Sequence, residues 1–370
     1  MTRYLIIDFM PEKKDEKLLK KSISIGGVSL AQKVEFARNL AVMIKSGLTI
    51  VDALRITKNS AQGKFKNSIE GVLKSVESGN SLSSSLARYP KIFSGMFVSA
   101  TYAGESSGTL EKNLDNLAEH LEKKKELTSK IKGAMLYPIV VLIAAFILGL
   151  AMAFLVLPKI IPLFEGLKTD LPLTTRILIK SSHFIDAHGL ALFLGIVIFV
   201  VFMSWLLKQK FVFPITHWLW LRTPIVKRII INSNLATFNR TLGLMLKSGL
   251  NINEALSVLN DTFNNYYYKK IIYKANESVS RGIKLSNHLA QYEKLFPKMV
   301  VSMIKVGEES GNLEETLYYL ANYYEVEVDN ATKSLSTAIE PILLIFIGLF
   351  VGFLALSIIT PIYSITGSIK

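Results

Sequence analysis

The sequence predicts an all-α integral membrane protein, in which two tandem cytoplasmic helical-bundle repeats are joined to three transmembrane helices. Three observations support this fold class: long uncharged apolar segments, an internal duplication, and apolar residues at helical spacing with weak strand signals. Of the 370 residues, 50% are hydrophobic and only 19% are charged, which argues against a disordered chain and an ordinary soluble protein. Because no cysteine occurs, disulfides, thiol nucleophiles and cysteine metal sites are excluded.

The three expected transmembrane helices are apolar stretches of sufficient length. Residues 134–157 are 24 residues without a charge, which reach roughly 36 Å at about 1.5 Å per residue. Residues 190–207 are 18 uncharged residues, near the lower limit for a span. The third span, residues 338–361, carries Glu340 at its inner edge and is expected to end near Pro361.

Basic residues set the expected orientation in the membrane. Residues 1–133 hold 22 Lys and Arg against 14 Asp and Glu, residues 208–337 hold 16 against 11, and residues 158–189 hold only 4 against 3. Lys and Arg near span ends favour the cytoplasmic side, so both large regions are expected inside. The formal net charge of +14 then reflects basic residues beside anionic lipid headgroups. Nucleic-acid binding is the weaker alternative, because no nucleic-acid motif accompanies these residues.

The predicted order is an N-terminal cytoplasmic segment, a cytoplasmic repeat, a span, a periplasmic loop, a span, a second cytoplasmic repeat, a span and a periplasmic tail. These parts cover residues 1–29, 30–133, 134–157, 158–189, 190–207, 208–337, 338–361 and 362–370.

The chain contains an internal duplication, because 11 of 19 positions are identical between FARNLAVMIKSGLTIVDAL, starting at Phe36, and FNRTLGLMLKSGLNINEAL, starting at Phe238. Further on, AGESSGTL from Ala103 matches VGEESGNL from Val306 at an offset of 203. The prolines that bracket the first and third spans correspond at the same offset: Pro138 with Pro341 and Pro158 with Pro361. The repeats are therefore parallel, and the second span returns the chain so that both lie on one side.

Each repeat is predicted to consist of helices. Apolar residues over 36–44 follow helical spacing, and Gly47 suits a left-handed position after that helix ends. Thr49 and Asn251, each followed three residues later by an acidic residue, are expected to be helix N-caps. Further helices are expected at about residues 64–78, 81–88 and 93–104, with a long polar helix from about residue 109 into the first span.

One pattern resembles a catalytic motif: residues 104–108 read G-x-S-x-G, the nucleophile elbow of hydrolases. That motif needs a strand before the turn, whereas the flanks here predict helix–turn–helix, and the second copy has Glu309 at the nucleophile position. A structural turn is favoured, with Ser or Glu capping the next helix. No P-loop sequence occurs, and the five histidines lack metal-ligand spacing. No catalytic residue, cofactor or metal site is therefore predicted.

Paired charges and turn residues are the candidates for partner contacts or structural roles. Arg38 and Arg240 occupy equivalent positions, and two interpretations stay open: a solvated or capping charge, or an electrostatic contact with a partner or between repeats. Glu340 has either a coupling or packing role or simply snorkels or caps. The full candidate set is Arg38, Lys45, Gly47, Gly104, Glu105, Gly108, Arg240, Lys247, Gly249, Gly307, Glu308, Gly311, Pro138, Glu340 and Pro341.

Two copies of the blocks F-x-R-x-L-x-x-M-x-K-S-G-L and G-E-x-S-G-x-L, in register over residues 30–365, resemble the type II secretion F family. This family comprises the inner-membrane platform proteins of type II secretion and type IV pilus systems. The resemblance implies small all-α bundles and a non-enzymatic, oligomeric platform of the bacterial inner membrane, with a cytoplasmic N-terminus and a periplasmic C-terminus.

The implied partners are a hexameric assembly ATPase, pilin or pseudopilin subunits, other inner-membrane assembly proteins, membrane lipids and further copies of the chain, with no nucleic acid. ATP-driven movement would pass through the platform to extract pilin subunits and add them to a filament. The alternative function is an oligomeric small-solute transporter or channel. Against it, no span carries a charge at mid-depth, where ion and proton pathways usually have one.

Overall fold

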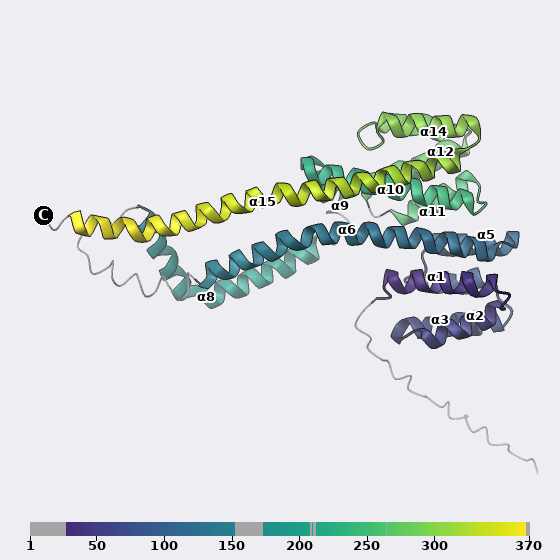
Figure 1. The fold of residues 1–370 in the computed structure, drawn as a ribbon, viewed down its shortest axis with the longest axis horizontal. Helices are drawn as coiled ribbons and strands as arrows, with labels where there is room; N and C mark the ends of the chain where they lie inside the picture. Colours follow the sequence, from purple (N-terminus) through teal and green to yellow (C-terminus); the bar gives the residue numbers. More distant parts are fainter. Residues whose placement is uncertain (1–26, 152–172, 208, 210–211, 264, 368–370) are drawn as a thin grey trace, which may run out of the picture.

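The computed structural model describes residues 27–151, 173–207, 209, 212–263 and 265–367. Within these residues every regular element is a helix, so the all-α prediction is confirmed for this part of the chain. Figure 1 shows an elongated molecule with short helices gathered at one end. Two long helices, α6 (Leu110–Ala151) and α15 (Leu313–Gly367), run from that end along most of its length.

The short helices form two bundles in which the helices follow in the same order. The first bundle contains α1 (Leu30–Lys45), α2 (Ile50–Ser60), α3 (Gly63–Glu77), α4 (Leu82–Ala87), α5 (Gly95–Ser107) and the start of α6. The second contains α10 (Pro224–Lys247), α11 (Ile252–Thr262), α12 (Tyr266–Ser280), α13 (Leu285–Leu289), the 3-10 helix η2 (Ala290–Tyr292), α14 (Lys298–Ser310) and the start of α15. Between the bundles the chain forms α8 (Leu173–Leu206) and α9 (Phe213–Arg222). The helices predicted within the first repeat therefore agree with α3, α4 and α5 to within three residues at each end.

Local signals start and stop these helices as predicted. The Thr49 hydroxyl accepts a hydrogen bond from the Asp52 N–H at 3.1 Å, which caps α2. Asn251 and Glu254 form a capping box at the start of α11. Gly47 has φ +89°, in the left-handed region that favours glycine, so the chain turns sharply between α1 and α2.

Aromatic rings pack at the centre of each bundle, and three of them occupy equivalent positions in the two bundles. In the first, the Phe36 ring centroid lies 5.3 Å from that of Phe93 and 5.6 Å from that of Phe65. In the second, the Phe296 centroid lies 5.2 Å from that of Phe238 and 5.4 Å from that of Tyr268. Tyr268 occupies the position equivalent to Phe65, and its buried hydroxyl donates to the Leu295 carbonyl at 3.0 Å, which satisfies the added polar group.

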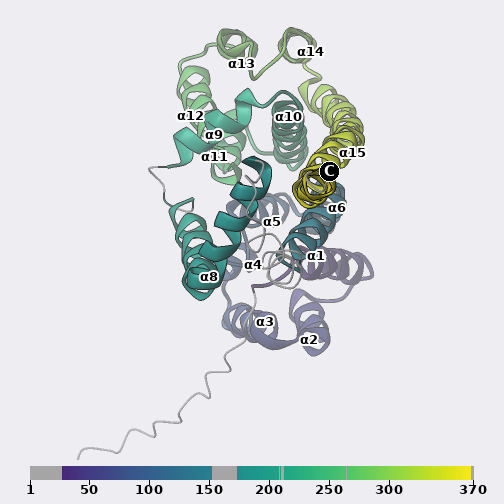
Figure 2. The same ribbon diagram turned by 90° about the vertical axis from the view of Figure 1, so that its left-hand side faces the viewer.

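The two bundles pack against each other and share one continuous core. Buried apolar residues of α1 to α6 and of α10 to α15 belong to a single cluster. Figure 2 shows α1 to α3 on one side of α5 and α6 and α10 to α14 on the other. The bundles are thus held together by burial of apolar surface.

Two helices are long and apolar enough to cross a membrane, within Leu110–Gly149 and Leu313–Phe353. Their apolar parts are largely exposed in the isolated chain, as at Ile147 and Leu349, which is the pattern of lipid-facing rather than core helices. They contact each other where Gly149 meets the Phe350 ring. The second predicted span falls within α8, whose shorter apolar stretch is Val197–Leu206.

Two boundaries differ from the sequence prediction. Helix α8 begins at Leu173, so the later part of the segment expected as a connecting loop is helical. This segment has no proline or glycine between residues 173 and 188, and apolar residues recur at helical spacing. Helix α15 continues past Pro361 to Gly367. A proline removes one backbone hydrogen bond without ending a helix when neighbouring groups compensate, as is common in membranes.

Some predicted features lie outside the described residues. They are the N-terminal segment to residue 26, the end of the first span and the loop over residues 152–172, Lys208 and Lys210, and the tail at residues 368–370.

Candidate functional site

Glu105, the acidic residue of the first G-E-x-S-G copy, caps the N-terminus of α4. Its carboxylate accepts hydrogen bonds from the Leu82 N–H at 2.5 Å, the Ser83 N–H at 3.1 Å and the Ser83 hydroxyl. Unpaired N–H groups and the positive end of the helix dipole favour a carboxylate there. The sequence had suggested that Ser or Glu caps the next helix. That interpretation is wrong for Glu105, because the capped helix lies 23 residues earlier in the chain.

Glu308 makes the same contacts in the second bundle. It accepts hydrogen bonds from the Leu285 N–H at 2.7 Å, the Ser286 N–H at 3.1 Å and the Ser286 hydroxyl, and so caps α13. The repeated motif thus ties α5 to α4 and α14 to α13 through one carboxylate each.

The glycines of the motif permit close helix packing and a sharp turn. A Cβ on Gly104 would lie 2.8 Å from the Leu110 Cα, and one on Gly307 would lie 2.9 Å from the Thr316 Oγ1. The last glycine of each copy ends its helix with φ of +70° and +71°; these residues are Gly108 and Gly311. The pattern G-x-S-x-G therefore lies in a helix–turn–helix, not in the strand–turn–helix context of a nucleophile elbow.

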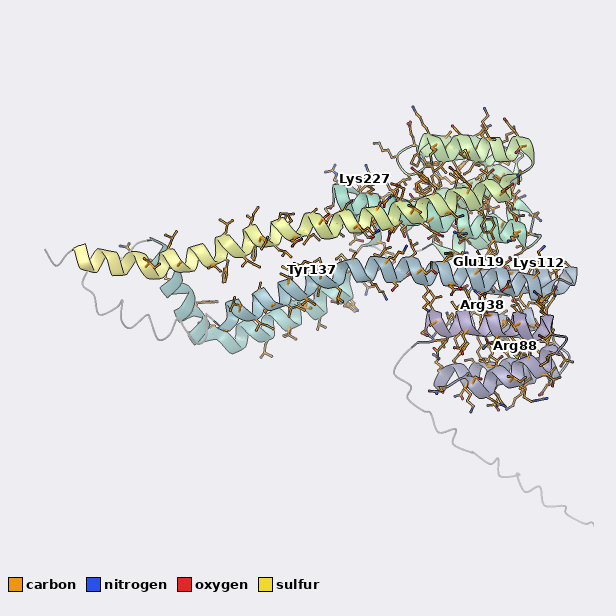
Figure 3. The ribbon with its side chains drawn as sticks, in the orientation of Figure 1. Arg38, Arg88, Lys112, Glu119, Tyr137 and Lys227 are labelled. Carbon is orange, nitrogen blue, oxygen red and sulfur yellow. The ribbon has the colours of Figure 1, made fainter. Side chains whose placement is uncertain are left out.

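Arg38 joins the first and last helices of its own bundle. From α1, its Nη2 lies 2.6 Å from Glu122 Oε2 and its Nη1 lies 3.4 Å from Asp115 Oδ1, both on α6. The three side chains are half exposed, so solvent weakens these ion pairs. Figure 3 shows Arg38 at the bundle end of the molecule.

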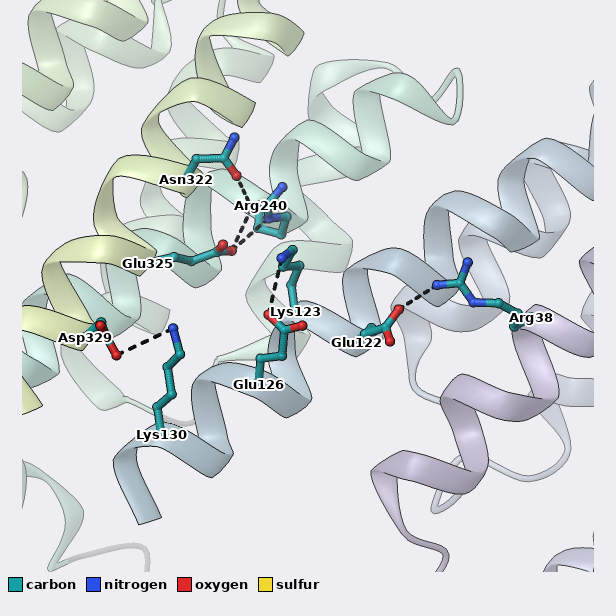
Figure 4. A network of polar contacts seen from close by, with 9 residues as sticks. All are labelled: Arg38, Glu122, Lys123, Glu126, Lys130, Arg240, Asn322, Glu325 and Asp329. Carbon is teal, nitrogen blue, oxygen red and sulfur yellow. Dashed lines mark hydrogen bonds and ion pairs between the residues drawn. The ribbon is translucent and has the colours of Figure 1, made fainter. Parts of the chain in front are cut away.

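Arg240 makes the equivalent connection in a buried setting. Its Nε and Nη2 lie 2.9 Å and 2.8 Å from Glu325 Oε1, and its Nη2 donates to Asn322 Oδ1. Its guanidinium also lies 5.5 Å from the Tyr318 ring centroid. The Arg240 side chain is 7% exposed, against 42% for that of Arg38. Figure 4 shows both arginines, each beside the carboxylate of its own bundle.

The two predicted lysines lie at the ends of the first helix of each bundle. Lys45 is the last residue of α1, where a positive charge interacts favourably with the helix dipole. Lys247 ends α10, and its Nζ lies 5.1 Å from the Tyr318 ring centroid, close enough for a cation–π contact. Gly249, with φ +92°, then turns the chain as Gly47 does in the first bundle.

The junction between the bundles brings α6 against α10. His120 is fully buried there, and neither ring nitrogen has a hydrogen-bond partner among the described residues. Beside it is a cavity of about 20 Å³, room for about one water molecule, lined in part by Lys124, Thr237 and Arg240. Nearby, the Asn113 side-chain amide reaches the Ser248 carbonyl at 3.4 Å.

Burial makes this junction unfavourable for added positive charge. It lowers the pKa of His120 to about 3, with further lowering by the charges of Lys124 and Arg240. Burial also lowers the pKa of Lys124. The pKa of Lys33 is lowered by burial and then by the charge of Lys124. His120 is thus neutral at physiological pH and acts as a packing residue.

A second set of ion pairs lies where the bundles meet the apolar helices. Lys130 Nζ on α6 lies 3.5 Å from Asp329 Oδ1 on α15, and Arg228 Nη2 on α10 lies 2.8 Å from Glu327 Oε2. The hydrogen bond from Arg228 lowers the pKa of the Glu327 carboxyl. These contacts connect the two long helices and α10 at one level of the molecule.

The span-edge candidates lie just beyond those ion pairs. Pro138 lies inside α6 and is buried, whereas Glu340 and Pro341 on α15 are exposed. In Figure 3, Tyr137, the repeat equivalent of Glu340, lies on the part of α6 beyond the bundles. Within the part of the chain that the structure describes, no hydrogen bond or ion pair of Glu340 distinguishes the two interpretations of its role.

Sequence reasoning missed the partners of the arginines and the buried junction. Glu122 and Glu325 could have been found, because they lie 203 residues apart, the offset of the second matched block. Nothing in the spacing of His120 or Asn113 identified them, because their burial depends on packing between bundles. Within the residues that the structure describes, no three His, Asp or Glu side chains group as metal ligands.

Comparison with known proteins shows that the chain is similar to one protein family and to individual proteins over nearly its whole length. The profile of the family described as type II secretion system (T2SS), protein F, matches residues 36–158 and 238–361. The chain is 37% identical to the type IV pilus assembly protein PilC of Thermus thermophilus, over 93% of this chain and 85% of that protein. It is 32% identical to PilC of Pseudomonas aeruginosa, over 94% of this chain and 95% of that protein. It is also 32% identical to the type II secretion system protein F of Aeromonas hydrophila, over 93% of this chain and 89% of that protein.

Proposed function

Because the chain belongs to the type II secretion system protein F family, we propose that it is a non-enzymatic platform protein of the bacterial inner membrane. In this role it couples a cytoplasmic assembly ATPase to the extraction of pilin or pseudopilin subunits and their addition to a filament. Relatives named for type IV pilus assembly and for type II secretion both match nearly the whole chain, which supports filament or secretion machinery as the setting.

The observation that carries this proposal is the continuity of α6 and α15. Each begins in the core of a bundle and continues without a break into an apolar segment, over 42 and 55 residues respectively. At about 1.5 Å per residue these helices reach roughly 60 Å and 80 Å. A movement imposed on a bundle would therefore be passed directly into the membrane.

The contact between the bundles supports a topology with three transmembrane spans and with both repeats on the same side of the membrane. Both bundles share one core, which supports a position of both on the same side of the membrane. The chain leaves the first bundle through α6 and must cross back before the second, and α8 is the helix available for that return. Helix α15 then crosses once more, which leaves the C-terminus on the opposite side from the bundles. The Lys and Arg excess of both bundle regions supports a cytoplasmic position for them.

The test is to crosslink the tagged protein in intact cells, purify it in detergent and identify its partners by mass spectrometry. Recovery of an assembly ATPase together with pilin-like proteins is the expected result, and the identity of those subunits distinguishes pilus assembly from secretion. Recovery of solute-binding or transport components without them would contradict the proposal and favour the transporter alternative.

A further inference from the structure

The two bundles touch each other through different surfaces. The surface that one bundle buries in this contact is exposed at the equivalent position of the other bundle. Within the chain, α6 of the first bundle packs on α10 of the second, next to the contact of α5 with α11. The equivalent of α6 is α15, and the equivalent of α10 is α1. The α15 surface that corresponds to the buried face of α6 is not covered by any of the residues that the structure describes. The same holds for the α1 surface that corresponds to the buried face of α10.

The buried face of α10 contains three residues that are spaced one helical turn apart. Arg240 lines the cavity beside His120, and Ser248 accepts the hydrogen bond from Asn113. Leu244 lies one turn from each on the same face and is 0% exposed. The equivalent residues of α1 are Arg38, Val42 and Ser46, which we call the open α1 face.

The open α1 face is accessible where its counterpart is covered. Val42, the equivalent of Leu244, is 55% exposed, and Arg38 and Ser46 are accessible as well. On the adjacent helix α2, Ile56 is also exposed. Exposed apolar side chains on α1 and α2 thus accompany a basic one, whereas the equivalent part of the second bundle lies at an interface.

The matching surface on α15 is apolar and aromatic. On α6 the surface at the junction contains His120 and Lys123, which line the cavity with Arg240, and Asn116, whose amide nitrogen is buried. Their equivalents on α15 are Tyr323, Val326 and Tyr319. These three residues, with Thr316, form what we call the open α15 face. Tyr323 is 41% exposed, whereas His120 is 4% exposed, and Tyr319 and Val326 are exposed too. Tyrosine is among the residues most enriched at protein interfaces.

Charge favours a pairing between the two open faces. Helices α1 and α2 carry five Lys or Arg and two Asp or Glu. Residues 298–333, which form α14 and the bundle part of α15, carry seven Asp or Glu and three Lys. The helices that carry the open α1 face are thus net basic and those that carry the open α15 face are net acidic, which favours a pairing of unlike faces over a pairing of like ones.

We propose that the open α15 face of one chain docks on the open α1 face of a second copy of this chain, head to tail. The contact repeats the arrangement of α6 on α10 within one chain. It is heterologous, so a pair of copies still has one open face of each kind, and assembly continues until a ring closes or a row extends. The inference deepens the proposed oligomeric platform and rests on that function for its biological setting.

The chain contains no cysteine, so introduced thiols report only the tested contact. Thr316 and Ser46 are the equivalents of Asn113 and Ser248, which touch inside the chain. The variant Thr316→Cys/Ser46→Cys, treated in isolated membranes with a short bismaleimide crosslinker, is expected to give covalent dimers and larger species. The single variants Thr316→Cys and Ser46→Cys are expected to stay monomeric on denaturing gels.

A dimer from either single variant would show a symmetric contact and overturn the proposal. Absence of crosslinks in the double variant would also overturn it, because the faces would then be occupied by another protein or by none. This readout needs no filament assembly, so failure of the proposed function in cells is distinguishable from failure of this contact.

A second measurement removes the contact instead of trapping it. Tyr319→Glu/Tyr323→Glu is expected to weaken self-association in detergent by roughly tenfold or more, since aromatic side chains dominate such interfaces. Tyr273→Glu, on α12, is the matched control, because Tyr273 is as exposed as Tyr319 but lies away from both faces. Equal self-association of the two proteins, with equal helical content by circular dichroism, would overturn the proposal.

Discussion

At the scale of single residues, equivalent positions in the two bundles have the same partners but different surroundings. Arg38 and Arg240 each bind a glutamate on the last helix of their bundle. Packing of the second bundle on α6 buries Arg240, while Arg38 stays half exposed. Ion pairs at equivalent positions therefore differ in what their loss costs, because a charge left unpaired inside a protein is far less well solvated.

Removal of Arg240 is expected to cost more stability than removal of Arg38. Arg240→Met leaves Glu325 partly buried without its partner and should lower the free energy of unfolding by about 3 kcal/mol. Arg38→Met should lower it by about 1 kcal/mol or less. Denaturant unfolding of the detergent-solubilised variants measures both, and equal losses would contradict the burial argument.

Protonation of His120 is expected to destabilise the fold in mild acid. Its pKa falls from an ordinary 6.5 to about 3 on folding, mainly through burial. Below about pH 6.5 the unfolded state therefore binds a proton at His120, whereas the folded state leaves His120 neutral. Stability should drop by about 2 kcal/mol between pH 7.5 and pH 5.

The variant His120→Phe keeps a ring at the junction and removes the titration. Its unfolding free energy, measured over the same pH range, should lack this part of the loss. An unchanged pH dependence would show that His120 does not titrate as its burial indicates.

At the scale of elements, the G-E-x-S-G motif connects neighbouring helices by a cap, a close approach and a turn. The glutamate binds the N-terminus of the short helix before it, and the first glycine lets the next long helix cross closely. The long helices that lead toward the membrane are thus positioned by residues in their own bundles.

Substitution of Gly104 tests this close approach. Gly104→Ala would place a methyl group 2.8 Å from the backbone of Leu110, and such overpacking should cost about 1–3 kcal/mol. Gly133→Ala is the matched control, because Gly133 lies in α6 with no atom within 4 Å of its added Cβ. That change should stabilise the helix by about 0.5–1 kcal/mol. Thermal unfolding compares the two, and a neutral Gly104→Ala would rule out a packing role.

At the scale of the whole molecule, the shared core of the two bundles supports the proposed path of the chain through the membrane. Burial of apolar residues from both bundles in one cluster requires that they lie on one side. In the proposed topology the chain crosses the membrane an even number of times between the bundles. Helix α8 then makes the return crossing, although it has no counterpart in the duplication.

Reporter fusions test this arrangement. Alkaline phosphatase, which is active only outside the cytoplasm, should be inactive when fused after Gly282 in the second bundle and active when fused after Lys370. An active fusion after Gly282 would place the bundles on opposite sides and contradict both the shared core and the three-span topology.

By itself, the sequence determined the features that depend on neighbouring residues. The N-caps at Thr49 and Asn251, the turn at Gly47, the long helix from about residue 109 and the duplication all follow from spacing over a few residues or from direct repetition. Such signals are local, since a cap or a left-handed turn needs only the side chains within one turn of helix.

Only the tertiary structure decided which of the repeated faces are covered. Arg240 and Glu325 meet across 85 residues, and His120 and Asn113 are buried by helices of the other bundle. Their counterparts Arg38, Tyr323 and Thr316 have nearly the same local sequence positions and stay accessible. The difference arises because the contact between the two bundles buries one copy of each face and leaves the other copy exposed. Helical spacing predicts which residues share a face but not which helix packs on it.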